Sequence, residues 1–248
     1  MVDFGRTRHD AQPAFVLHSY PYRETSLVLE VFTHDHGRLA LVARGARRPR
    51  STLRGVLLAF QPLLLSWAGK SELRTLHKAE WQGGLPALKG DGLLCGFYLN
   101  ELLLKLLARD DPHEQLYAVY EQTLRALGRG TERAVILRRF EMRLLKELGY
   151  APTLDRDALS GAPINAGRTY CFLIERGPAL CNGEDAAGGS TRNGLELSGQ
   201  TLLDMAEDDF SRPVTMQQSK ALMRALINHY LGSQTLNTRQ LLRDLQQL

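Results

Sequence analysis

Six arginines lie in the segment 38–54, RLALVARGARRPRSTLR, which contains no acidic residue. Gly45 and Pro49 interrupt regular structure there, so most of the segment is expected to form a loop. The planar guanidinium group matches the oxygens of a phosphate, and a solvated loop with this much fixed charge favours a polyanion. Nucleic acid is therefore the first hypothesis for its ligand. The alternative is a charged loop that is only solvated.

The excess positive charge is confined to the N-terminal third of the chain. The 248 residues include 31 Lys and Arg and 27 Asp and Glu, a net charge of +4. Residues 1–82 hold 12 of the basic and 7 of the acidic residues, a net charge of +5, and the remainder holds 19 and 20, a net charge of −1. This distribution fits a local anion-binding module better than a generally basic surface.

Other residue types that do chemistry form no complete site. His34 and His36 look like a metal-binding pair, but two histidines supply only half of a tetrahedral shell. Nine residues separate Cys171 from Cys181, and both are expected to be small buried hydrophobic residues. The sequence has no phosphate-binding glycine motif and no nucleophile elbow. We therefore expect no catalytic residue, no metal and no cofactor, and predict that the protein is not an enzyme.

Composition and hydropathy predict a cytoplasmic protein. Three cysteines do not make a disulfide framework, which fits a reducing compartment. Residues 1–12 lack the apolar core of a signal peptide. The longest apolar run, 93–108, is interrupted by Asn100, Glu101 and Lys105 and is too short to cross a bilayer. The expectation is a soluble protein with no membrane partner.

The first eighty residues show the pattern of short strands separated by turns. In one run, Leu27, Leu29 and Val31 share a face and Glu30 lies on the other, which is the period-two pattern of a half-buried strand. Runs rich in Val, Leu, Phe and Thr predict strands at 14–20, 26–33, 38–43, 63–67 and 73–79. Five strands in this length indicate a small barrel or sandwich. A five-stranded OB-type barrel, which binds oligonucleotides, fits the count.

A helical period begins after the Gly83-Gly84-Leu85-Pro86 turn. Helices are predicted at 92–109, from Pro112 to Gly128, from a cap at Thr131 to Leu148, from Pro213 to Tyr230 and from Thr238 to Leu248. Residues 150–210 are rich in Gly, Asp, Asn and Ser and are expected to be irregular, with a small hairpin at 169–173 and 179–181. The predicted fold class is α+β, with a barrel domain of residues 1–82 and an all-α domain of residues 83–248.

Several motifs, in this order, are similar to those of the RecO family of bacterial DNA repair proteins. The N-terminal ones are Ala14–Ser19, Glu24–Leu27, Val31–Thr33, Arg44–Arg47, Ser51–Gly55 and Phe60–Leu65. The helical ones are Tyr98–Leu102, Leu137–Glu141, Leu148–Tyr150, Leu231–Gly232 and Thr238–Leu242. The resemblance covers nearly the whole chain, and its N-terminal motifs are the more specific ones.

The resemblance implies a recombination mediator with an N-terminal OB fold and a C-terminal helical domain. Such a protein binds single- and double-stranded DNA, anneals complementary strands and works with RecR. It also engages single-stranded-DNA-binding protein, so that RecA is loaded indirectly onto the coated strand. A cytoplasmic, nucleoid-associated location follows, and the family is not known for catalysis.

One departure from the family pattern concerns a zinc site in the insertion. Many members carry two C-x-x-C pairs, which here would fall at Asp157 and Ser160 and at Cys181 and Glu184. Three of the four thiolates are missing, so we expect no zinc and an insertion held by packing alone. The segment is interpreted as a degenerate zinc-finger-like insertion.

The candidate site residues follow from the charge pattern and the resemblance together. The predicted DNA contacts are Arg38, Arg44, Arg47, Arg48, Arg50 and Arg54, with Lys70 and Arg74 as weaker candidates. Tyr20, Tyr22 and Trp67 are candidates for stacking on bases, although aromatic residues in strands mostly belong to a core. In the helical domain, Arg138 and Arg139 are predicted to receive the acidic, Phe-ended tail of single-stranded-DNA-binding protein.

Two other function classes stay open from the residues alone. A protein adaptor would use the basic loop to bind an acidic protein partner, and an oligonucleotide titration at low salt distinguishes it. A metal-dependent nuclease would need a carboxylate cluster that the sequence does not indicate.

Overall fold

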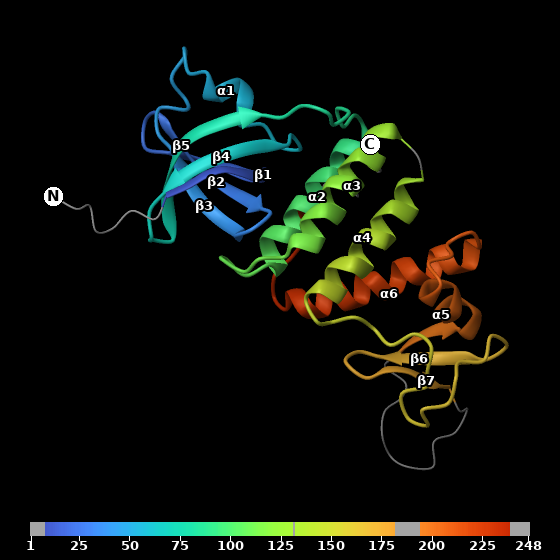
Figure 1. Ribbon diagram of the computed structural model, residues 1–248. Coiled ribbons are helices and arrows are strands. Elements are labelled where there is room, and N and C mark those ends of the chain that lie inside the picture. The colour runs from blue at the N-terminus through green and yellow to red at the C-terminus, as the bar shows by residue number, and fades with distance from the viewer. Residues whose placement is uncertain (1–7, 131, 182–193, 239–248) are drawn as a thin grey trace. The chain divides into compact units, whose positions relative to one another are not determined.

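The computed structural model describes residues 8–130, 132–181 and 194–238. The chain divides into two compact units (Figure 1). The first contains Met1–Thr131 and Leu236–Leu248, and the second contains Glu132–Thr235. These units do not follow the predicted boundary at residues 82 and 83, because two of the helices pack with the barrel.

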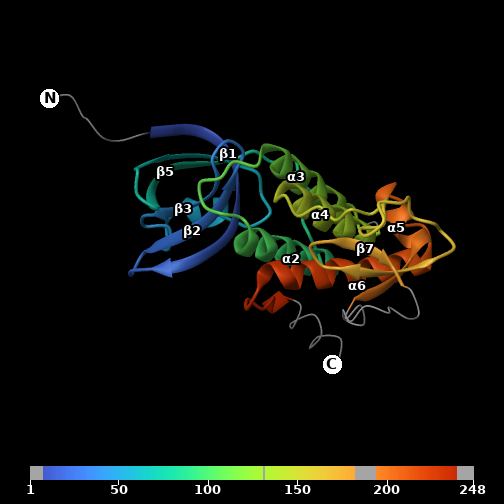
Figure 2. The ribbon, with the colours of Figure 1, turned by 90° about the horizontal axis from the view of Figure 1, so that it is seen from below.

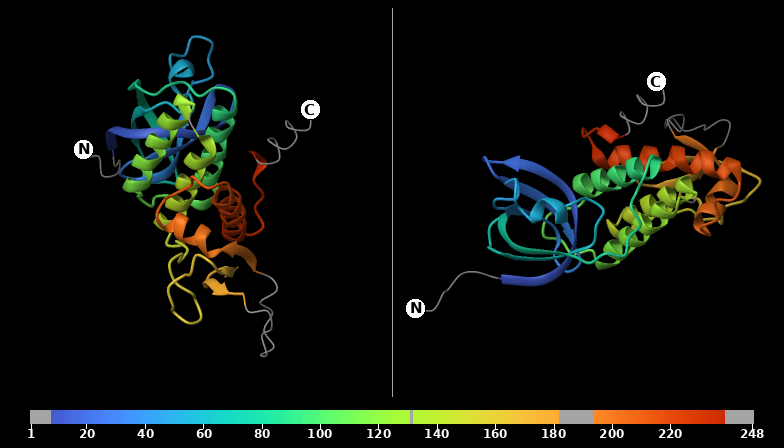
Figure 3. Two further views of the ribbon diagram at one scale, coloured as in Figure 1. Left: turned by 90° about the vertical axis from the view of Figure 1, so that its right-hand side faces the viewer. Right: turned by 90° about the horizontal axis from the view of Figure 1, so that it is seen from above.

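A closed five-stranded barrel occupies the N-terminal part of the first unit. Its strands are β1 (Arg8–Tyr22), β2 (Ser26–Thr33), β3 (Gly37–Ala43), β4 (Leu63–Ala68) and β5 (Leu73–Trp81). Their order around the barrel is β1-β2-β3-β5-β4, with β3 parallel to β5 and β1 closing the barrel against β4. Figures 2 and 3 show the strands curving around this barrel. The predicted OB-type barrel is confirmed, and β1 begins earlier than expected.

Apolar side chains occur on both faces of the strands β1 and β2. One set fills the barrel, and the other lies on its outside. Leu29 and Val31 of β2 point into the core, as the period-two pattern predicted. Phe15 and Phe32 lie on the opposite face of β1 and β2, yet both are fully buried. They pack against Tyr117, with ring centroids 5.4 and 5.5 Å away. The outer face of β1 and β2 is therefore buried under a helix instead of facing solvent.

Two helices complete the first unit: α2 (Asp91–Leu106) and α3 (Glu114–Arg129). Two polar residues of α2, Asn100 and Glu101, are buried. Asn100 donates to the carbonyl of Leu17 in β1 over 2.8 Å and accepts from the hydroxyl of Tyr120. These bonds join α2 to both the barrel and α3, so the helical pair belongs to the barrel unit.

The second unit contains α4 (Arg133–Glu147), α5 (Gly199–Ala206) and α6 (Pro213–Leu231) with a three-stranded sheet. The strands are β6 (Thr169–Leu173), β7 (Gly177–Leu180) and β8 (Leu195–Ser198), in the order β7-β6-β8. The predicted hairpin is confirmed as β6 and β7. The sequence reading missed β8 and α5. The core contains Leu145, Phe172, Leu197, Leu202, Leu222 and Leu226.

Cys171 and Cys181 are not simply small buried hydrophobic residues, as was expected, because they form a disulfide with a Cα–Cα distance of 5.4 Å. Cys171 lies opposite Ala179 in the hairpin, and Cys181 follows two residues later. The backbone N–H of Cys181 continues the ladder by donating to Thr169 over 3.1 Å. The hairpin register therefore brings the two sulfur atoms together, although the nine-residue spacing gave no sign of it.

The expectation that packing alone holds the insertion is wrong, because a buried carboxylate also ties its segments together through hydrogen bonds. Asp157 Oδ1 accepts from the backbone N–H groups of Leu159 and Ser160 over 3.0 and 2.8 Å and from the Ser160 hydroxyl over 2.9 Å. Its Oδ2 accepts from the N–H of Leu180 over 2.7 Å. Burial alone would raise the pKa of Asp157, but these hydrogen bonds lower it overall.

The residues present do not fit a zinc ion. Asp157 and Ser160 use their oxygens for hydrogen bonds, Cys181 is in the disulfide, and Glu184 lies outside the described residues. Within residues 8–130, 132–181 and 194–238, no group of three or more His, Cys, Asp or Glu side chains is arranged to hold a metal.

The described helices follow the helical period of the sequence. The predicted helices at 92–109, 112–128, 131–148 and 213–230 correspond to α2, α3, α4 and α6. The expected cap Thr131 and almost all of the expected helix Thr238–Leu248 lie outside the described residues. Over the described part of the chain, no helix has the length and apolarity needed to span a membrane.

Candidate nucleic-acid interface

The basic loop, residues 44–62, connects β3 to β4 at one end of the barrel. It is a chain of tight turns, with Arg48 donating to Gly45 over 3.1 Å and Ser51 donating to Arg48 over 3.0 Å. Gly45 has φ of 68°, a left-handed conformation that suits glycine. Ala46 is fully buried in the barrel core between exposed arginines. One small apolar side chain thus fixes the loop while its charged neighbours face solvent.

A short helix, α1 (Leu53–Val56), fixes the second half of the basic loop. Leu53 and Val56 pack against the barrel core, and buried Leu57 belongs to that core. Arg54, between these apolar residues, is exposed. Apolar residues that pack against the barrel thus alternate with exposed arginines along the loop. The arginines are therefore held at fixed places on the barrel surface.

The turn between β1 and β2 is tied to the basic loop and adds a cation that sequence reasoning missed. The N–H of Arg47 donates to Thr25 over 2.8 Å, and its guanidinium contacts the carbonyls of Arg23 and Glu24 at 3.5 and 3.4 Å. Arg23 is exposed in this turn. A lone arginine in a hairpin turn carried no signal, because its neighbour in space comes from a segment about twenty residues away.

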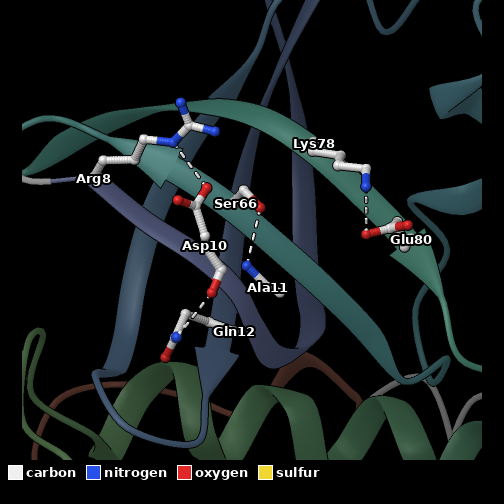
Figure 4. A network of polar contacts seen from close by, with 7 residues as sticks. All are labelled: Arg8, Asp10, Ala11, Gln12, Ser66, Lys78 and Glu80. Atoms are coloured by element: carbon white, nitrogen blue, oxygen red, sulfur yellow. Dashed lines mark hydrogen bonds and ion pairs between the residues drawn. The ribbon is translucent and has the colours of Figure 1, made fainter.

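Four other cations of the barrel have acidic partners, whereas the exposed loop arginines have none within the described residues. On the outer face of β1, β4 and β5, Arg8 pairs with Asp10 and Lys78 pairs with Glu80, each over 2.8 Å (Figure 4). Within the described residues, no ion pair is formed by Arg44, Arg47, Arg48, Arg50 or Arg54. The positive field at this end of the barrel is therefore uncompensated.

Arg38 and Arg74 do not join this array. Arg38 pairs with buried Glu30 over 2.9 Å and donates to the carbonyl of Leu107 over 3.1 Å. Glu30 also binds Arg109, in the connection between α2 and α3. Arg74 pairs with Asp110 over 2.6 Å in the same connection. Their side chains are only 15% and 16% exposed, so both arginines hold the α2–α3 connection against the barrel.

Lys70 lies at the other end of β3 from the basic loop. It is exposed in the turn before β5, which starts beside Ala40 and runs parallel to β3. Figure 1 shows this turn and α1 at different ends of β5. Lys70 is therefore not brought together with the loop arginines.

The three aromatic candidates have different surroundings. Trp67 is fully buried and stacks on His9 with ring centroids 5.1 Å apart, so it belongs to the core. The Arg23 guanidinium lies 5.2 Å from the ring centroid of half-buried Tyr22. Tyr20 is 46% exposed beside His18. Of the three, Tyr20 retains the largest open face.

Four histidines of the barrel, His9, His18, His34 and His36, contact aromatic or acidic neighbours. His34 contacts Asp35, and His36 packs edge-on against Trp67 with centroids 5.5 Å apart. Burial, and then the charges of His36 and Arg74, lower the pKa of His9. His9 is therefore neutral at neutral pH, and it adds no positive charge at that end of the barrel.

The two arginines predicted to receive a peptide tail already have partners in the second unit. Arg138 is buried and pairs with fully buried Glu141 over 2.8 Å. Arg139 pairs with Asp208 over 2.9 Å, and both of these side chains are more than half exposed. Neither is among the residues that line a hollow of about 580 Å³ in this unit. That hollow is lined by Phe172, Leu173, Ile174, Arg176, Gly194, Leu195, Leu222 and Ala225.

Two protein-family models match this chain, one over its N-terminal part and one over its C-terminal part. Residues 9–84 match the family described as "Recombination protein O N terminal", and residues 88–240 match "Recombination protein O C terminal". The N-terminal match spans the barrel strands and the basic loop.

Individual relatives agree with the family match. The chain is 60% identical to DNA repair protein RecO of Nitrosospira multiformis over the full length of both chains. It is 56% identical to DNA repair protein RecO of Aromatoleum aromaticum, over 98% of this chain and 99% of that protein. An Azoarcus DNA repair protein RecO is also 56% identical, with the same coverage. The chain therefore belongs to the RecO family of DNA repair proteins.

Proposed function

We propose that this protein is a recombination mediator that binds single- and double-stranded DNA through the basic loop and anneals complementary strands. We further propose that it acts with RecR and with single-stranded-DNA-binding protein, and so helps to load RecA onto the coated strand. Membership of the RecO family supports this assignment, since it gives the chain a role in DNA repair. The proposed mechanism is binding and positioning, without covalent chemistry.

One observation carries the DNA-binding part of the proposal. The exposed arginines of the basic loop have no acidic partner within the described residues, while Arg8, Arg38, Arg74 and Lys78 of the same barrel all do. An unpaired guanidinium gives up only water when it meets a phosphate, whereas a paired one must also break its ion pair. Phosphates should therefore bind at the loop in preference to the rest of the barrel.

The loop arginines would act in a way that does not depend on sequence. Each arginine that neutralises a phosphate releases condensed counterions, which favours binding to any strand at low salt. Charge neutralisation also lowers the repulsion between two complementary strands held on one protein. Annealing thus follows from the same residues as binding.

The test is a triple substitution, Arg48→Ala, Arg50→Ala and Arg54→Ala, in the full-length protein. Arg47 is left unchanged because its contacts with Arg23 and Glu24 help to hold the loop. We expect DNA affinity, measured by anisotropy of a labelled oligonucleotide, to fall by at least about tenfold at low salt. Annealing of strands coated with single-stranded-DNA-binding protein should fall in parallel.

A matched control removes three positive charges that have acidic partners: Arg8→Ala, Lys78→Ala and Arg125→Ala, whose partners are Asp10, Glu80 and Glu121. This variant has the same net charge as the loop triple variant, but it should bind DNA almost as the wild type does. Equal losses in the two variants would show that net charge matters and that the loop is not the site. No binding of oligonucleotide by the wild type at low salt would favour the protein-adaptor alternative.

A further inference from the structure

The chain has two tryptophans, and they lie in opposite environments. Trp67 is fully buried in the barrel, whereas Trp81 is 61% exposed at the end of β5. Leaving an indole of this size in water forgoes a large hydrophobic gain.

The Trp81 ring is held in place despite its exposure. Its Nε1–H donates to the side-chain oxygen of Gln61 over 2.9 Å. The ring also lies beside Gly83, where an added Cβ would be 3.5 Å from the nearest ring atoms. One edge and one side of the indole are thereby fixed, and its polar N–H is satisfied. The remaining surface is an apolar face that is oriented before any ligand arrives.

Trp81 is connected to the basic loop through that loop's own residues. Gln61, which holds the indole, lies at the end of the segment that begins with Arg44. Helix α1, with Arg54, packs against β5. Because β5 runs parallel to β3, its C-terminal end points to the same end of the barrel as the loop that follows β3. The open indole face and the unpaired arginines therefore belong to one region of the barrel surface.

We propose that Trp81 is a stacking platform for an unpaired base of single-stranded DNA whose phosphates are bound by the basic loop. This inference rests on the proposed function and adds to it a contact that is made only with single-stranded DNA. An apolar ring face beside guanidinium groups matches a nucleotide, which presents a flat base next to an anionic phosphate. In a duplex each base is already stacked on its neighbours, so the platform acts only on unpaired strands.

The test uses the fluorescence of the full-length protein. Trp67 is buried and supplies a constant background, so quenching by a ligand reports on Trp81. We expect oligo(dT) to quench the emission, and an abasic strand of equal length or a blunt duplex to bind without quenching it. Trp81→Ala should weaken oligo(dT) binding by about tenfold. It should leave binding of the abasic strand and of the duplex unchanged.

Two further variants separate stacking from general damage. Trp81→Phe keeps an aromatic face and should retain most of the affinity for oligo(dT). Leu159→Ala removes another large exposed hydrophobic side chain, 68% exposed in the second unit, and should change nothing. Unchanged Trp67 emission in Trp81→Ala would show that the barrel is intact.

The failure of this inference can be distinguished from failure of the proposed function. Oligo(dT) binding that depends on the loop arginines, with no quenching and no loss in Trp81→Ala, would overturn the platform and leave the proposed function standing. Equal losses of oligo(dT) and abasic-strand binding in Trp81→Ala would also overturn it. No binding of any strand by the wild type would overturn both proposals.

Discussion

At the residue scale, the partner of a charged side chain decides what that side chain is free to do. Arg38 and Arg48 are ten residues apart and chemically identical, but Arg38 is committed to buried Glu30 and Arg48 faces solvent. Removing Arg38 would leave a buried carboxylate with one fewer cation, which is costly to the fold. Removing Arg48 should cost the fold little and affect only a bound anion.

The same reasoning applies to the acidic, Phe-ended tail of single-stranded-DNA-binding protein, which was predicted from the sequence to bind the helical domain. Such a tail needs a cation beside an apolar slot, and Arg176 lines the hollow that also contains Phe172 and Leu222. We expect Arg176→Ala to weaken binding of a labelled tail peptide by about tenfold, because a charge-assisted hydrogen bond is lost. The measurement is fluorescence anisotropy with the full-length protein.

The comparison variants for this prediction are Arg139→Ala and Arg156→Ala. Arg139 was expected from the sequence together with Arg138, which is buried, and Arg156 is an exposed arginine of the same unit that lies 3.8 Å from Asp155. Neither change should lower the affinity for the tail peptide by more than about twofold, because exposed ion pairs contribute little free energy. A large loss in Arg139→Ala without one in Arg176→Ala would place the tail on α4 instead.

Sequence reading identified the residue types of the proposed DNA site but not their environments. The arginine segment was visible because its six like charges follow one another closely along the chain, with no acidic residue between them. Trp67 ends one predicted strand and Trp81 follows the end of another by two residues, and alternation alone does not show which of them the barrel encloses. Arg23 and Trp81 were missed because each depends on neighbours in space, Arg47 and Gln61, that are distant in the chain.

At the element scale, α2 is the helix that joins the parts of the first unit. Its buried polar residues each reach a different segment, with Asn100 bonded to β1 and Glu101 bonded to residues 237 and 238. Glu101 accepts the backbone N–H groups of Asn237 and Thr238 over 2.8 and 2.9 Å, and Lys105 lies 2.9 Å away. A carboxylate of α2 thereby fastens the returning chain to the barrel unit.

Glu101→Gln should destabilise the first unit in a pH-dependent way. Burial alone would raise the pKa of Glu101, but the hydrogen bonds from Thr238, Lys105 and Asn237 lower it overall. Its contribution is therefore fully present above the unfolded pKa of about 4.3 and is lost as pH falls through the lower folded value. We expect a loss of about 2 kcal/mol at pH 7.

Urea unfolding followed by Trp67 emission measures this effect in the barrel unit. The difference between wild type and Glu101→Gln should shrink as pH falls below about 4. Taking the difference at each pH removes the contribution of other carboxylates with a lowered pKa, such as Asp157. A difference that stays constant from about pH 7 to about pH 3 would show that the charge of Glu101 does not carry the anchoring.

Long periodic elements were predictable from sequence, and short ones set by tertiary contacts were not. The five barrel strands and helices α2, α3, α4 and α6 have at least six residues each and lie where the sequence predicted a strand or a helix. Strand β8 has four residues and α5 has eight, and both depend on packing against β6 and α6. The Cys171–Cys181 disulfide likewise follows from hairpin register, which spacing does not encode.

At the scale of the whole molecule, the second unit is an insertion between α3 and the returning segment of the first. The excess of positive over negative charge lies in the barrel, where ion pairs neutralise Arg8, Arg38, Arg74 and Lys78 but none of the basic-loop arginines within the described residues. The proposed division of labour follows from this distribution. The first unit would bind DNA. The second unit, which is nearly neutral, would bind protein partners and would not attract the DNA strand.

The salt dependence of DNA binding tests this distribution of charge. Each phosphate neutralised on a single strand contributes about −0.7 to the slope of log K against log salt concentration. Arg44, Arg48, Arg50 and Arg54 alone therefore predict a slope of about −3 for the wild type.

The loop triple variant at residues 48, 50 and 54 should have a slope that is shallower by about 2. The charge-matched variant, in which Arg8, Lys78 and Arg125 are replaced by Ala, should keep the wild-type slope. In the wild type these three side chains are already paired with carboxylates. Titrations of oligo(dT) at a series of salt concentrations give all three slopes. If the loop triple variant and the wild type have parallel lines, the counterions are released elsewhere, and the phosphates do not bind at the basic loop.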